Sequence, residues 1–225
     1  MPWDLHELAG RLGQTLQDAE NAYRIEQAVF GLDALDDLEL HQLFVRGLSP
    51  TCSAQREVST PSTSAKRRNL RVRADLVLTP AGRPLRTSDE PDLFTPADAC
   101  PPEEALWLNL RVIRQFPPLS NPRSTHGAAF RAALAVDHSK LIADARITDS
   151  ALAVVVFSDT QETLGGFVQA IDADLALAGL TPADSAARRH VRSVSITDRL
   201  GHRLASVALW STADPHPEFA HAVPH

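Results

Sequence analysis

The chain has 225 residues, of which 44% are hydrophobic and 22% are charged, as in an ordinary globular protein. Its formal net charge of −6 excludes a general attraction to nucleic acid, so any such binding needs a local basic patch. The cysteines, Cys52 and Cys100, lie in polar or proline-flanked stretches, which argues against a disulfide framework and favours a reducing cytoplasm. No apolar stretch has the length of a membrane span, and the first residues lack the pattern of a signal peptide. We therefore expect a cytoplasmic protein with one domain over 1–210 and a flexible tail over 211–225.

The first half of the chain predicts helices followed by strands. Residues 3–30 and 34–48 carry apolar side chains at helical spacing, and Asp33 is a plausible N-cap of the second helix. A strand of alternating residues is expected over 70–79. Residues 80–103 contain six prolines, which predicts a long loop or insertion.

The second half predicts alternating strands and helices. Its expected elements are a strand over 105–116, a helix over 126–147, a buried strand over 150–157, a helix over 161–178, and a hairpin of strands over 192–198 and 203–210. This order predicts an α/β protein. We expect a three-layer α/β/α sandwich with a mixed central sheet and an extra N-terminal helical segment.

Polar side chains interrupt the two central strands. In 105–116, the leucines at 106, 108 and 110 share one face, and Asn109 and Arg111 lie on the other face. In 70–79, Asp75 shares a face with two arginines. If the two strands pair, Asp75 becomes a neighbour of Asn109 and Arg111 across the sheet.

A further acid, Glu39, lies in the second predicted helix. Leu35 precedes it by four residues and Leu43 follows it by four, which predicts a carboxylate on the apolar face of the helix. An acid at such a position is expected to have a partner or a function.

The sequence resembles the PD-(D/E)xK nuclease superfamily in one of its divergent bacterial branches. Three stretches carry the resemblance: Glu39 in DLELHQL, Asp75 in RVRADLVLTP, and Asn109 with Arg111 in LWLNLRVIRQF. The resemblance covers about residues 30–180 and implies a restriction-endonuclease-like fold. It also implies that Glu39 and Asp75 hold Mg²⁺, which polarises the scissile phosphate.

The sequence departs from that family at two positions. Asn109 replaces the second strand acid, and Arg111 replaces the lysine that serves the attacking water. Arginine cannot be deprotonated in a protein, so both changes argue against hydrolysis by the family mechanism. Only two of the 22 basic residues are lysines, and of these Lys140 is positioned to replace the missing one. Gln115 resembles a polar residue that many relatives carry after the motif.

Three functions stay open at this point. The first is a nuclease-fold protein with a degenerate site, in which Arg111 neutralises Asp75 and the chain is a nucleic-acid-associated or scaffold module of a bacterial system. The second is a Mg²⁺-dependent DNA endonuclease that uses Lys140 or Arg111. The third is a protein-interaction subunit of a bacterial complex. The basic residues expected to contact a phosphate backbone are Lys66, Arg67, Arg68, Arg71 and Arg73.

Overall fold

The computed structural model describes residues 3–63, 72–86, 96–116, 128–180 and 189–211. The α-helices in these ranges are α1 (Leu5–Ile25), α2 (Asp37–Leu48), α3 (Ala128–Ile142) and α4 (Gln161–Leu177). The strands are β1 (Cys52–Ser59), β2 (Arg73–Pro80), β3 (Leu106–Arg114), β4 (Asp149–Ser158), β5 (Arg189–Ser195) and β6 (Leu204–Ser211).

These strands form one mixed sheet of six, in the order β1-β2-β3-β4-β6-β5. β3 and β4 run parallel because α3 carries the chain back between them, whereas every other neighbouring pair is antiparallel. β5 and β6 form the predicted hairpin, and β1 lies at the opposite edge of the sheet, beside β2.

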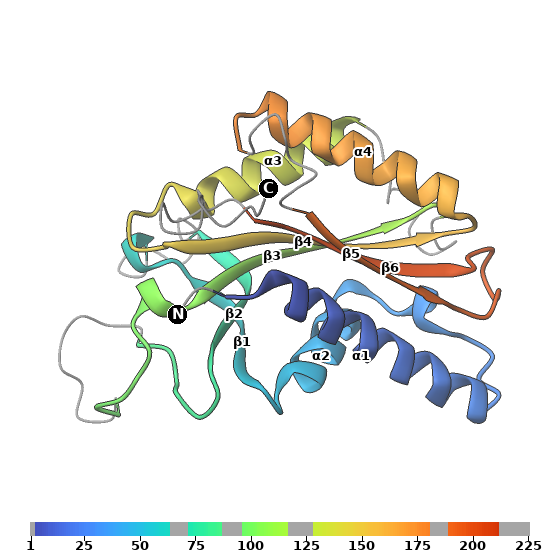
Figure 1. Cartoon of the computed structure of the whole chain (residues 1–225), viewed down its shortest axis with the longest axis horizontal. Helices are drawn as coiled ribbons and strands as arrows, with labels where there is room; N and C mark the ends of the chain where they lie inside the picture. Colours follow the sequence, from blue (N-terminus) through green and yellow to red (C-terminus); the bar gives the residue numbers. More distant parts are fainter. Residues whose placement is uncertain (1–2, 64–71, 87–95, 117–127, 181–188, 212–225) are drawn as a thin grey trace, which may run out of the picture.

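Helices cover both faces of the sheet: α1 and α2 lie on one face, and α3 and α4 on the other (Figure 1). The leucines of β3 at 106, 108 and 110 pack with α1 and α2 in the largest hydrophobic cluster. On the other face, α3 and α4 pack against β4 and Trp210 of β6. The α/β class and the mixed central sheet are therefore as predicted. The apolar run in β4 is buried along almost its whole length, as expected for a strand covered on both faces.

The start of α2 differs from the prediction. Its N-cap is Asp36, whose side chain accepts the N–H of Glu39 at 2.7 Å, while Glu39 Oε2 accepts the N–H of Asp36 at 2.8 Å. This reciprocal pair is a capping box. Asp33, predicted as the cap, is fully buried in a preceding 3₁₀ turn, where its carboxylate lies 3.0 Å from Nδ1 of His202.

The described parts of the proline-rich segment after β2 pack against the sheet, with Leu85 and Cys100 in a cluster with Val77 and Trp107. Leu85 and Cys100 form an isolated parallel bridge, and a short 3₁₀ turn over Pro102–Glu104 leads into β3. Among the described helices, none combines the length and apolar character needed to cross a membrane.

Candidate functional site

The candidate site lies at Asp75, where β2 and β3 diverge. The pairing of β2 with β3 ends at Leu76 and Leu108, although β3 continues beside β4 as far as Arg114. Asp75 Oδ2 accepts the backbone N–H of Leu110 at 2.8 Å, so a side-chain carboxylate replaces the missing strand partner. On the other side, Glu57 of β1 adopts a φ of 51° and is not paired with Asp75, although β1 and β2 keep the same register before and after it.

Arg111 connects two carboxylates at this position. Its Nη1 lies 2.5 Å from Asp75 Oδ2, and its Nη2 lies 2.9 Å from Oδ2 of Asp137 on α3. Nη1 also donates to the carbonyl of Leu110 at 2.9 Å. Burial opposes the charge of Arg111, but the two carboxylates outweigh it and hold the pKa of the guanidinium above its ordinary value. The predicted contact between Asp75 and Arg111 is thus present.

Asp137 brings Lys140 into the same set of ion pairs. Lys140 Nζ donates to Asp137 Oδ1 at 2.9 Å, three residues away on α3. Burial opposes the charge of Asp137, but hydrogen bonds from Lys140 and Arg111 outweigh it and lower the pKa of this carboxyl. We call Asp75, Arg111, Asp137 and Lys140 the Arg111 network. Lys140 therefore approaches Asp75 only through two intermediate side chains.

His41 of α2 lies close enough to Asp75, Arg56 and Arg111 to interact with their charges. Burial lowers the pKa of His41, assisted by the charges of Arg56 and Arg111 and opposed by Asp75. The imidazole is accordingly neutral near pH 7 and adds no charge to the network.

Asn109 and His138 lie between β3 and α3 and do not join these ion pairs. Asn109 is 3% exposed, and its Nδ2 has no hydrogen-bond partner among the described residues. His138 is fully buried, with neither ring nitrogen hydrogen-bonded within the described part of the chain. Burial lowers the pKa of His138 to about 4, so this side chain is neutral at physiological pH.

The remaining predicted site residues are spread over the molecule. Glu39 is exposed at the start of α2, so its predicted position on the apolar face is wrong; the buried face consists of Leu40, Phe44 and Leu48. Gln115 accepts the N–H of Asp159 and connects the end of β3 to the turn after β4.

Of the predicted basic patch, the structure describes one residue. Arg73 Nη1 lies 3.5 Å from Glu57 Oε2 in a partly exposed ion pair. Lys66, Arg67, Arg68 and Arg71 lie outside the described residues.

The Arg111 network does not fit a Mg²⁺ ion. Mg²⁺ requires several oxygen ligands in octahedral geometry. Here the guanidinium of Arg111 lies between the two carboxylates, and Asn109 supplies no negative charge. Glu39, the other predicted ligand, is bound to the backbone of Asp36. No group of three or more His, Cys, Asp or Glu side chains within the described ranges is arranged to hold a metal.

Two acids and two bases cancel in the Arg111 network, so it has no excess negative charge to attract a cation. The sequence did not identify Asp137, although its position one helical turn before Lys140 is compatible with a shared ion pair.

Comparison of the chain with protein-family models, curated proteins and solved structures gives no significant match.

Proposed function

We propose that this protein is a non-catalytic module of the restriction-endonuclease-like type that associates with nucleic acid. The order α2, β1, β2, β3, α3, β4 supports this proposal, because the PD-(D/E)xK resemblance implies a helix, an acid-bearing strand, the motif strand and a helix–strand unit in that order. We also propose a cytoplasmic location, in keeping with two buried cysteines that are both free thiols.

The observation that carries the proposal is the position of Arg111. Its guanidinium contacts Asp75 at 2.5 Å and Asp137 at 2.9 Å, where a metal-dependent nuclease would need a cation. Arg111 supplies a permanent positive charge to the carboxylates, and Lys140 supplies the second, but a guanidinium neither lowers the pKa of a water molecule nor accepts its proton. The site is accordingly stable without metal and lacks an activated nucleophile.

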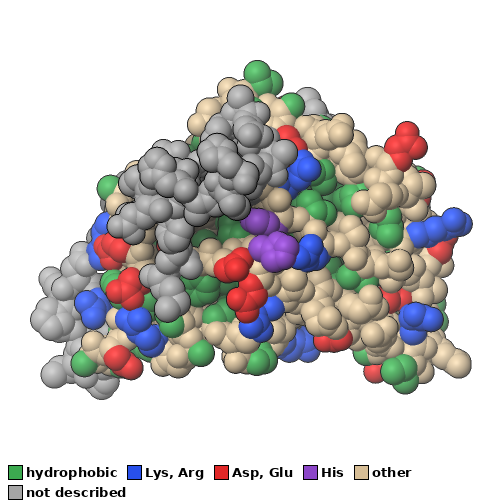
Figure 2. Space-filling view, in the orientation of Figure 1, with side chains coloured by type: hydrophobic (Ala, Val, Ile, Leu, Met, Phe, Trp, Pro, Cys, Tyr) green, Lys and Arg blue, Asp and Glu red, His purple; other side chains and the backbone are tan. Residues whose placement is uncertain are grey.

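Nucleic-acid binding is assigned to the basic segment that leads into β2. The described surface gives no alternative large basic area on the face in Figure 2, where acidic and basic side chains are interspersed. With a net charge of −6, binding must come from a local cluster, and residues 66–73 carry five of the 22 basic side chains.

The first experiment is a cleavage assay. Wild type and Asp75→Ala are incubated with plasmid and linear DNA in Mg²⁺ or Mn²⁺, and we expect no cleavage by either protein. Cleavage by wild type that is lost in Asp75→Ala would instead support the Mg²⁺-dependent endonuclease.

The second experiment measures binding by gel shift at about 50 and about 200 mM salt, between which phosphate contacts weaken strongly. We expect wild type to bind at the lower salt concentration, and a variant with Lys66, Arg67 and Arg68 changed to alanine to lose binding. A matched control removes three exposed arginines elsewhere, Arg24, Arg46 and Arg203. Equal loss in both variants, or no binding by wild type, contradicts the proposal.

A protein-interaction subunit is the second candidate, and one observation favours it. Ile25, Val29 and Phe30, at the end of α1 and just after it, are 83%, 80% and 65% exposed. Neighbouring exposed apolar side chains are typical of interaction surfaces. If this candidate is correct, a partner recovered from the native host is lost when the three residues are changed to serine. Recovery of the protein alone argues against it.

A further inference from the structure

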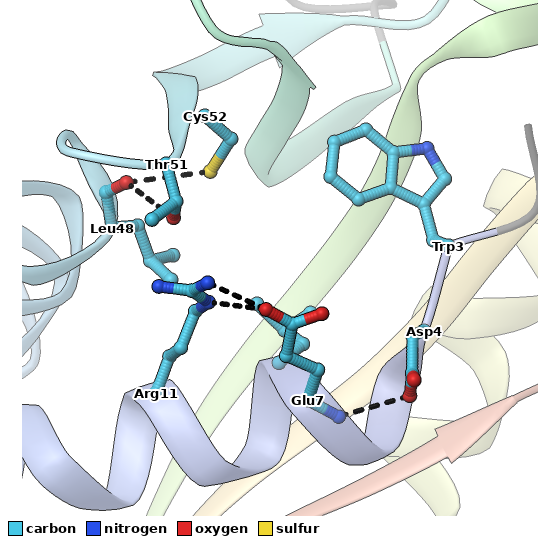
Figure 3. A pocket seen from close by; sticks show the side chains of 8 residues that line it. Trp3, Asp4, Glu7, Arg11, Leu48, Thr51 and Cys52 are labelled. Atoms are coloured by element: carbon cyan, nitrogen blue, oxygen red, sulfur yellow. Dashed lines mark hydrogen bonds and ion pairs between the residues drawn. The ribbon is translucent and has the colours of Figure 1, made fainter.

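A groove lies where the start of α1 meets the beginning of β1 and the segments that follow β2 and precede β3 (Figure 3). Its larger part has a volume of about 540 Å³, and a smaller part of about 150 Å³ adjoins it. Both parts are lined by Trp3, Asp4, Glu7 and Thr51. This size is in the range of small-molecule sites in proteins, about 300–1,000 Å³. We call it the Trp3 groove.

The indole of Trp3 forms one wall and is fixed in place. Its Nε1–H donates to the carbonyl of Glu104 at 3.1 Å, which ties the start of the chain to the turn before β3. Opposite the indole in Figure 3 lie Cys52 and the Glu7–Arg11 pair. Ala81, in the exposed turn after β2, belongs to the lining of the larger part. A rigid aromatic face thus borders a partly apolar space.

The charged side chains around the groove have an excess of one negative charge. Glu7 pairs with Arg11 at 2.5 Å, and Glu104 pairs with Arg83 at 3.1 Å. Asp4 adds a third carboxylate, and the N–H of Glu7, which it accepts at 2.9 Å, lowers the pKa of Asp4. An anionic ligand would have to displace a carboxylate from its guanidinium, whereas a cation can approach Asp4, the N-cap of α1, which pairs with a backbone N–H and not with a guanidinium among the described residues.

Cys52 does not give the groove covalent chemistry. Its thiol donates to the carbonyl of Leu48 at 3.6 Å, and burial raises its pKa. A buried thiol with a raised pKa is a poor nucleophile, so the groove is suited to reversible binding.

We propose that the Trp3 groove binds a small organic cation with a flat apolar body, either a free arylalkylamine or a short peptide in which an aromatic side chain adjoins a basic one. The flat body stacks on the indole of Trp3, and the cationic end lies among Asp4, Glu7 and Glu104. Among cation–π contacts, those with a tryptophan ring are the strongest. This site shares no residue with the Arg111 network and is independent of the nucleic-acid proposal.

Calorimetric titration of the full chain tests the chemistry with three probes: phenylbutylamine, the anion phenylbutyrate, and N-acetyl-phenylalanyl-arginine amide. We expect at least one cationic probe to bind about tenfold more tightly than phenylbutyrate. The tighter of the two cationic probes identifies the source of the ligand. Equal affinity for phenylbutyrate, or no binding of any probe, overturns the proposal.

Two variants locate the site. Trp3→Ala removes the aromatic wall, and Ala81→Phe adds bulk to the groove from an exposed turn while Trp3 is kept. Each is expected to weaken cation binding about tenfold, whereas Leu177→Ala, at an 86% exposed position on α4, leaves it unchanged. Circular dichroism confirms that each variant is folded. Unchanged affinity in a folded Trp3→Ala or Ala81→Phe variant refutes the assignment.

Discussion

Replacing Arg111 by methionine removes the guanidinium but keeps most of the aliphatic stem. Asp75 then loses its contact at 2.5 Å and Asp137 loses its contact at 2.9 Å, and the two carboxylates remain near each other. Loss of one partner from a fully buried ion pair costs about 3–5 kcal/mol, whereas exposed pairs contribute about 0–1 kcal/mol. The side chains of Arg111, Asp75 and Asp137 are 28%, 23% and 36% exposed, between these limits. We therefore expect Arg111→Met to lower the free energy of unfolding by about 2 kcal/mol.

Urea denaturation followed by circular dichroism measures this loss at neutral pH. In Arg111→Met, Asp137 keeps its ion pair with Lys140, so Asp75 is the carboxylate left without a cation. Adding Asp75→Asn removes that charge, so the double variant should be less destabilised than the sum of the two single changes. Arg11→Met, which breaks an exposed pair with Glu7, is the matched control and should cost less than about 1 kcal/mol. If Arg111→Met unfolds within about 0.5 kcal/mol of wild type, the guanidinium does not neutralise the site and our electrostatic reasoning fails.

Three further changes test separate parts of the structure. The pKa of His138 falls from an ordinary 6.5 to about 4 on folding, so the free energy of unfolding is unaffected by this group above pH 6.5 and decreases as the pH falls toward 4. Over this range wild type should lose about 3 kcal/mol more than His138→Leu in urea titrations, and parallel curves for the two proteins contradict this. Glu39→Ala should cost about 0.5–1 kcal/mol through loss of the capping box, while Glu39→Gln keeps most of the stability; a large, metal-dependent effect in thermal denaturation would contradict a purely structural role. Arg199→Met removes the guanidinium that pairs with the fully buried Glu20 and should lower the free energy of unfolding by about 3 kcal/mol in urea titrations. A loss below about 1 kcal/mol would refute this value.

Several elements were predictable because their signal is local. The alternation in 105–116 assigned the leucines of β3 to one face and Asn109 and Arg111 to the other. The leucines pack with α1 and α2, and Arg111 contacts Asp137 of α3 on the opposite face. The apolar run of β4 predicted burial on both faces. The contact of Asp75 with Arg111 was predicted from the pairing of the two strands; it is present, although that pairing ends at Leu76, one residue before Asp75 is reached.

Other features depend on contacts that the sequence does not encode locally. Leu35 suggested an apolar face for Glu39, but α2 begins at Asp37, so the helical spacing does not extend back to Leu35. Asp137 reaches Arg111 only because α3 packs against β3, a tertiary arrangement that no spacing along the chain reveals. Asp33 seemed a helix cap, yet it is buried against His202, which is 169 residues away in the sequence.

The most direct test of the central claim is a titration of wild type and Asp75→Asn with Mn²⁺, followed by the relaxation of water protons, together with a separate incubation of each protein with DNA and Mn²⁺. If Arg111 occupies the place of the cation, the two proteins give the same weak signal at millimolar Mn²⁺ and neither cleaves the DNA. Mn²⁺ binding by wild type that Asp75→Asn abolishes, together with cleavage of the DNA, would contradict the account.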